Sequence, residues 1–152
     1  MKKIILFQKL KKFFGKYLSK KRPLNNNDKA LKAALTKLCK NPHGEFVIAS
    51  EVSSDKFIQF AGSKHESLKV DLPIQTLSSD EIERAVSLFQ EYGVSHERSV
   101  LLDEPGGKPI GIQAGFHLDV QNNIALAVEI AMRVFKEVYL FQSNFELELE
   151  VV

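Results

Sequence analysis

The sequence predicts an α+β domain: an antiparallel sheet with helices mainly on one face, preceded by a basic amphipathic helix. Two observations lead to this class. Short runs rich in β-branched and aromatic residues alternate with longer runs in which apolar residues recur every three or four positions. Their order is α-β-β-β-α-β-β-α, and the connections between successive strands are mostly short, which favours antiparallel pairing.

The first 22 residues differ in charge from the rest of the chain. They hold nine lysine and arginine residues and no acidic residue, which leaves 12 basic residues against all 19 acidic ones in 23–152. On a helix, apolar side chains of this segment share one arc and most lysines lie opposite. We call residues 1–22 the leader, and its expected contact residues are Phe7, Leu10, Phe13, Phe14 and Tyr17.

Three roles fit such a leader. Its apolar arc can enter a membrane surface while its lysines meet anionic lipid, it can engage another protein, or it can pack on the chain's own body or on a dimer partner. Nucleic acid is not expected as a partner, because the acidic body repels phosphate. The longest apolar run of the leader, at 4–7, is too short for a secretory signal. We expect a cytoplasmic protein, peripheral at the inner membrane if the leader binds lipid.

Composition divides the chain into four segments. Pro23 and three consecutive asparagines separate the leader from the body, and glutamates alternate with apolar residues near the end. The predicted segments are the leader at 1–22, a polar hinge at 23–27, a body at 28–141 and an acidic tail at 142–152.

The body opens with a helix at 28–40, in which leucines recur at helical spacing. Asn27 or Asp28 can cap its start. The Asn41-Pro42 step ends it, because the residue before a proline disfavours helical geometry.

Three strands are expected next. The runs at 46–49 and 57–60 are separated by Ser53-Ser54-Asp55, which is typical of a hairpin. A third strand at 68–72 alternates apolar and charged residues, as in a half-buried strand.

The second helix, at 78–92, has the clearest local signature. Ser78 followed three residues later by Glu81 forms a capping box, and Gly93 suits a helix end.

Strands at 100–102 and 110–118 come next, and a last helix is expected at 120–140. Its apolar arc covers more than half of the circumference, which predicts burial on more than one side. The tail at 142–152 alternates with period two and is expected either to add a final strand or to bind a partner.

No pattern in the chain is typical of catalysis or metal binding. The four histidines lack the short paired spacings of a zinc site, and no base can be assigned to Cys39. Gly106-Gly107-Lys108 lacks the other residues of a phosphate loop. We expect no enzymatic activity, no cofactor and no metal.

Alternation along the strands assigns a binding face. We expect Phe46, Ile48, Ile58 and Phe60 to face the helices together with the large residues of the later strands. The opposite face would carry small, polar and a few apolar side chains, with Phe57 as an aromatic anchor. The expected partner-binding residues are Val47, Phe57, Gln59, Asp71, Gln113 and His117.

The order of elements, the sequences FIQFA at 57–61 and VDLP at 70–73, and the helix start and stop between Leu77 and Gly93 resemble the type III secretion chaperone-like superfamily. The nearest likeness is to its TY-Chap and YbjN-type peptide-binding chaperone domains, over roughly 28–141. The resemblance implies non-catalytic binding of a client protein or peptide segment, and frequent dimerisation. It covers neither the leader nor the tail.

A second class of function fits the same features. A small bacterial immunity protein or inhibitor, which binds and neutralises one toxin or effector, would also have an acidic body and no active site. The two classes differ in kinetics, since an inhibitor of one partner dissociates far more slowly than a binder of many segments.

Overall fold

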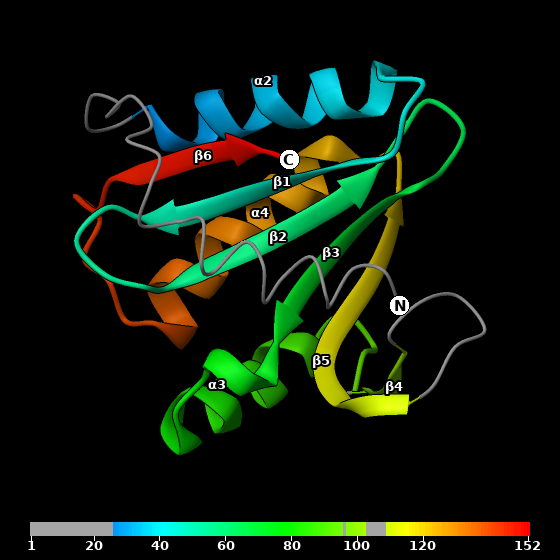
Figure 1. Cartoon of the computed structure of the whole chain (residues 1–152). Coiled ribbons are helices and arrows are strands. Elements are labelled where there is room, and N and C mark those ends of the chain that lie inside the picture. Colours follow the sequence, from blue (N-terminus) through cyan, green and yellow to red (C-terminus); the bar gives the residue numbers. More distant parts are fainter. Residues whose placement is uncertain (1–25, 96, 103–108) are drawn as a thin grey trace.

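The computed structural model describes residues 26–95, 97–102 and 109–152. The predicted leader with its five contact residues, hinge residues 23–25 and the Gly106-Gly107-Lys108 step lie outside these ranges. Within these ranges three α-helices pack with one sheet (Figure 1), so the predicted α+β class is confirmed. The helical elements are α2 (Asn27–Lys40), η1 (Ile74–Thr76, a 3-10 turn), α3 (Ser79–Gln90), α4 (Ile124–Arg133) and η2 (Val134–Val138, a π-helical turn).

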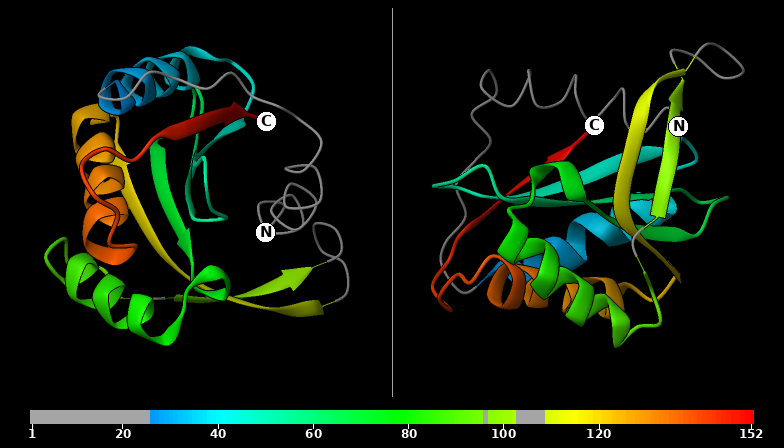
Figure 2. Two further views of the ribbon diagram at one scale, coloured as in Figure 1. Left: turned by 90° about the vertical axis from the view of Figure 1, so that its left-hand side faces the viewer. Right: turned by 90° about the horizontal axis from the view of Figure 1, so that it is seen from below.

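Six strands of the described ranges form a single antiparallel sheet in the order β4-β5-β3-β2-β1-β6. Their bounds are β1 (Glu45–Glu51), β2 (Phe57–Gly62), β3 (Leu68–Pro73), β4 (Glu97–Leu102), β5 (Pro109–Gln121) and β6 (Leu147–Val151). The sheet is curved, and the helices lie on its convex side (Figure 2). We call the side that packs on the helices the core face and the opposite side the open face.

The core fills the space between the sheet and the helices. α2 covers β1, β2 and β6, while α4 covers β3 and β5. Fully buried leucines of α2 meet the apolar residues of the strands, and Phe89 of α3 stacks on Phe116 of β5 with ring centroids 4.8 Å apart. The core is therefore continuous from β6 to β5.

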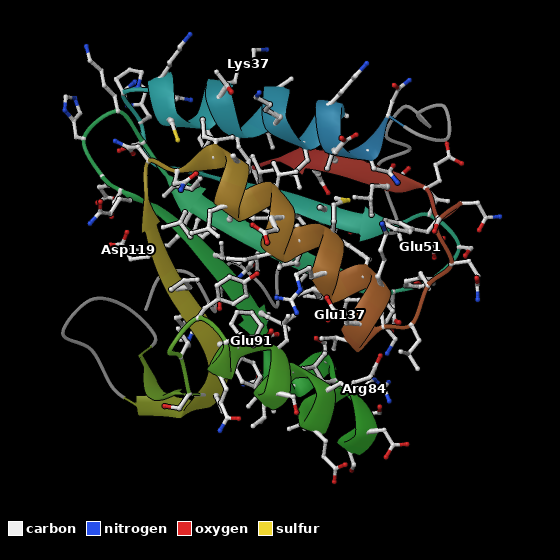
Figure 3. The ribbon with its side chains drawn as sticks, turned by 180° about the vertical axis from the view of Figure 1, so that it is seen from behind. Lys37, Glu51, Arg84, Glu91, Asp119 and Glu137 are labelled. Atoms are coloured by element: carbon white, nitrogen blue, oxygen red, sulfur yellow. The ribbon has the colours of Figure 1, made fainter. Side chains whose placement is uncertain are left out.

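α3 and α4 are joined by one arginine. Arg133 lies 2.5 Å from a carboxylate oxygen of Glu91 and 2.5 Å from one of Glu137, the two glutamates being labelled in Figure 3. It also donates to the Tyr92 hydroxyl at 3.0 Å. Arg84 of α3 donates to the carbonyl oxygen of Val138 at 2.9 Å. These contacts hold α3 beside η2, where the sheet alone gives it little support.

The start of the first helix differs from the expectation. Asn26, not Asn27 or Asp28, is the N-cap. Asn27 is buried inside the first turn, where its amide nitrogen donates to Phe145 O at 2.7 Å and its oxygen accepts from Leu147 N at 3.1 Å. The acidic tail thus adds a final strand, β6, which pairs with β1 and is bonded to the start of α2.

The last helix is shorter than predicted. β5 continues to Gln121, so α4 begins at Ile124, with the Asn123 side chain accepting from Leu126 N at 3.1 Å. The helix widens into a π turn, in which Tyr139 N donates to Val134 O at 3.0 Å.

The second helix has the predicted start and ends at Gln90, two residues before the predicted end. Ser78 Oγ accepts from Glu81 N at 3.2 Å, and Glu81 Oε1 accepts from Ser78 N at 2.8 Å, so the capping box is confirmed. Gly93 has a φ of 73°, and its amide donates to Gln90 O at 3.0 Å. Only glycine adopts this left-handed conformation without cost.

Candidate functional site

The register of the first hairpin reverses the predicted faces of β1. Val47 lies opposite Phe60, and Ala49 lies opposite Ile58. Directly paired residues share a face, and all four belong to the core cluster. Val47 is therefore a core residue, 0% exposed, and its assignment to the binding face is wrong.

Ile48 takes the place that Val47 was expected to fill. Ile48 pairs with Gln59, Gln59 with Asp71, and Asp71 with His117. These four residues form a row across β1, β2, β3 and β5 on the open face. Phe57 is two residues from Gln59 on the same strand, so it shares that face. Four of the predicted binding residues, Phe57, Gln59, Asp71 and His117, are thus brought together.

The sixth predicted residue is placed only by its backbone. Gln113 pairs with Ser99 in the β4–β5 ladder, four residues before His117 on β5.

A polar network runs along the row. The amide nitrogen of Gln59 donates to Asp71 Oδ2, and His117 Nδ1 lies 2.8 Å from Asp71 Oδ1. The contact of Asp71 with His117 becomes an ion pair when the imidazole is protonated. Asp71 is 3% exposed, so these two partners compensate a carboxylate that would otherwise be costly to bury.

The imidazole of His117 lies over a glycine. A Cβ at Gly115 would come within 3.2 Å of His117 Nε2 and within 3.2 Å of Leu72 O. Such distances are closer than side chains normally allow, so the absence of a side chain at 115 leaves room for the ring to reach Asp71.

The other end of the network holds an unused acceptor. A carboxylate only accepts hydrogen bonds, so the NH₂ group of Gln59 must face Asp71 and its oxygen must point away. Gln59 is 1% exposed, and its Oε1 has no hydrogen-bond partner within the described ranges; nor does the buried Ser50 Oγ. A buried acceptor without a partner costs about 1–3 kcal/mol.

The apolar residues around this acceptor are buried as well. Ile48 is 1% exposed, Phe57 5% and Ala61 8%, yet none belongs to the core cluster on the other side of the sheet. No helix or strand of the described residues crosses the open face (Figure 2).

Acidic side chains border the open face at β6. Glu148 and Glu150 pair with Ser50 and Ile48, so they point to the same side. Both are half-buried, and burial, together with the charge of Glu148, raises the pKa of Glu150 above its usual value. On the other side of the row, Lys69 of β3 is exposed.

The site offers an acceptor that has no partner in the described ranges, a buried carboxylate in contact with an imidazole, and apolar side chains. In the part of the chain that the structure describes, no cluster of histidine, cysteine, aspartate or glutamate could hold a metal ion. Cys39 lies in α2 against the core, where burial raises the pKa of its thiol and disfavours the nucleophilic thiolate.

Sequence reasoning missed Ile48 and Ser50. The segment at 46–49 is apolar at every position, so its alternation does not tell one face from the other. The only available signal was the length of the loop at 52–56, which sets the register of the hairpin.

No helix in the described ranges is long and apolar enough to cross a membrane. Comparison with protein-family models, with curated proteins and with solved structures finds no match to this chain.

Proposed function

We propose that this chain is a non-catalytic protein-binding module that holds a segment of a client protein on its open face. The observation that carries the proposal is the buried Gln59 oxygen, which has no hydrogen-bond partner in the described ranges and lies on the face that Ile48 and Phe57 share. A donor from a bound segment would satisfy this oxygen and remove the cost of leaving it unpaired.

The composition of the face supports binding of a polypeptide. Interfaces draw most of their affinity from a few buried, well-packed apolar anchors, and polar groups fix the orientation of the partner. Phe57 and Ile48 are apolar side chains of this kind. The contacts among Gln59, Asp71 and His117 hold polar groups in place across β2, β3 and β5, where they can orient a partner. The resemblance to peptide-binding chaperone domains agrees with this proposal.

The test is selection of peptides from a random display library on the full chain. A selected peptide is then titrated calorimetrically against the wild type, Gln59→Ala and the matched control Gln90→Ala, which removes an exposed glutamine on α3. We expect Gln59→Ala to weaken binding by tenfold or more, which is about 1.4 kcal/mol, and Gln90→Ala to leave it unchanged. Equal affinity for the two variants would overturn the assignment to the open face.

Dissociation kinetics separate the second class of function. A module for client segments should bind several selected peptides and release them within seconds, whereas an inhibitor of one folded toxin should select none and dissociate slowly from its one partner. The absence of any selected peptide that depends on Gln59 would therefore favour the inhibitor.

A further inference from the structure

We propose that the leader, residues 1–22, docks on the open face of its own chain, with its apolar arc against Ile48, Phe57 and Ala61 and its lysines toward the acidic border at β6. This proposal rests on the proposed function, because it concerns the same face. It identifies the leader as the segment that covers this face when no client is bound. A client would then have to displace the leader.

The first argument is burial. Ile48, Phe57 and Ala61 are almost fully buried although no described helix or strand crosses the open face, and we infer that the rest of the chain covers them. Apart from one residue, that remainder is 1–25 and the segment 103–108, whose sequence DEPGGK has no apolar side chain large enough to bury them. The leader holds a whole arc of such side chains, at Leu6, Phe7, Leu10, Phe13, Phe14, Tyr17 and Leu18.

The second argument is reach. The described chain begins at Asn26, beside the start of β6, because Asn27 is hydrogen-bonded to Phe145 and Leu147. A 22-residue helix is about 33 Å long, and six strands side by side span about 24 Å between the outer two. A leader that starts at the β6 edge is therefore long enough to cross the whole open face.

The third argument is charge. The leader carries nine cationic side chains and no acidic one, while the border at β6 presents two glutamates on the open face. Lysine only donates hydrogen bonds, and the two carboxylates at this border accept them. The raised pKa of Glu150 agrees with a border at which two carboxylates repel each other, a cost that nearby ammonium groups would relieve.

The test uses the full chain with a nitroxide spin label on the leader. Ser19 lies on the arc opposite the leader's apolar residues, so Ser19→Cys carries the label in a Cys39→Ser background, which leaves no other thiol. The readout is paramagnetic broadening of two isoleucine methyl signals: Ile48 on the open face and Ile58 on the core face of the adjacent strand. A matched label at Lys37→Cys, on the exposed side of α2, controls for distance from the convex side.

We expect the leader label to broaden Ile48 more than Ile58, and the α2 label to do the reverse. Mixing spin-labelled chains that carry no isotope with isotope-labelled chains that carry no spin label should leave Ile48 sharp, because docking is within one chain. Broadening of Ile48 in this mixture would assign the face to the leader of a second copy and overturn the proposal. Equal or no broadening of the two methyls would place the leader elsewhere and overturn it too.

Two variant pairs test the contacts. Phe13→Asp/Phe14→Asp should release the leader and sharpen Ile48. Glu148→Gln/Glu150→Gln should reduce the broadening of Ile48, whereas the matched pair Glu83→Gln/Glu129→Gln on the exposed faces of α3 and α4 should not. Equal effects of the two glutamine pairs would contradict the role of charge.

The same variants separate this proposal from the proposed function. If the leader competes with clients, Phe13→Asp/Phe14→Asp should bind a selected peptide at least about tenfold more tightly than the wild type. If the leader label broadens Ile48 but no selected peptide depends on Gln59 for binding, the docked leader is supported and the proposed client binding is contradicted. If peptides bind through Gln59 but the leader label does not broaden Ile48, client binding is supported and the docked leader is contradicted.

Discussion

Two residues of the described chain end their helices in the left-handed region of backbone conformation, and only one is suited to it. Gly93, after α3, has a φ of 73°, and Leu140, after η2, has a φ of 61°. For a residue with a Cβ this conformation costs about 1–2 kcal/mol. A Cβ at Gly93 would meet no atom within 4 Å, so this cost can be measured without steric clash.

Substitutions at these two positions should change the free energy of unfolding in opposite directions. We expect Gly93→Ala to lower the free energy of unfolding by about 1 kcal/mol. Leu140 is 57% exposed, so Leu140→Gly loses little burial and should raise the free energy of unfolding, by up to about 1 kcal/mol. Denaturant titration measures both, and a neutral Gly93→Ala would contradict the backbone argument.

The lowered pKa of Glu81 makes the stability of the fold depend on pH. Its burial acts to raise its pKa, but hydrogen bonds from Lys56 and from the Ser78 amide, with the charge of Lys56, outweigh burial and lower the pKa. A group whose pKa is lower in the folded state stabilises the fold above its unfolded pKa, about 4.3 for glutamate. That contribution is lost as the pH falls through the folded value.

Glu81→Gln should therefore be less stable than the wild type at pH 7, by about 1 kcal/mol or more. The difference should narrow as the pH is lowered from 5 to 3, because the wild-type carboxylate then becomes protonated. Urea titrations over this range provide the measurement. A difference that stays constant down to pH 3 would show that the charge of Glu81 does not contribute.

At the scale of elements, the sequence pattern correctly predicted those features that depend on residues close together in the chain. The capping box of α3 depends on residues three positions apart, so Ser78 and Glu81 identified it. The faces of β2, β3 and β5 followed from alternation, which brought Gln59, Asp71 and His117 together correctly. The start of α4 was missed because β5 extends to Gln121, a strand length set by pairing with β3 rather than by its own sequence.

The face of β1 was beyond local reasoning for a different reason. Both sides of this strand are buried, and both carry apolar residues, so burial of either face satisfies the hydrophobic effect. The register of the hairpin makes the choice: it sets Val47 against Phe60 and leaves Ser50 on the open face. Only knowledge of the turn geometry would have given this result.

Substitutions on the two sides of β1 should report this register. Val47→Thr buries a hydroxyl in the apolar core and should lower the free energy of unfolding by about 1–3 kcal/mol. Ser50→Ala removes a buried hydroxyl that has no hydrogen-bond partner within the described ranges, and should be neutral or stabilising. Thermal unfolding compares the two, and the reverse order would place Val47 on the open face and Ser50 in the core.

At the scale of the molecule, one side chain joins the two ends of the described fold. The amide of Asn27 bonds the first turn of α2 to the segment that leads into β6. Among the described strands, β6 pairs on one side only, with β1, whereas β2 and β3 are paired on both sides. The stability of α2 and β6 should therefore depend on each other more than on the centre of the sheet.

Asn27→Ala should lower the free energy of unfolding by about 1–3 kcal/mol, because it leaves two buried backbone groups unpaired. Hydrogen exchange should speed up in α2 and β6 together, while the amides of β2 and β3 continue to exchange through global unfolding. Asn144→Ala, at an exposed asparagine, is the control. Uniform acceleration across the sheet would contradict a separate α2–β6 unit.

The bond between Asn27 and Phe145 also sets the order of events during translation, since its partners lie 118 residues apart. At a synthesis rate of 5–20 residues per second, Asn27 leaves the ribosome roughly 6–24 s before the partners that fix it. Throughout that interval β1 has no β6 to pair with. The α2–β6 unit therefore forms only after translation has passed β6.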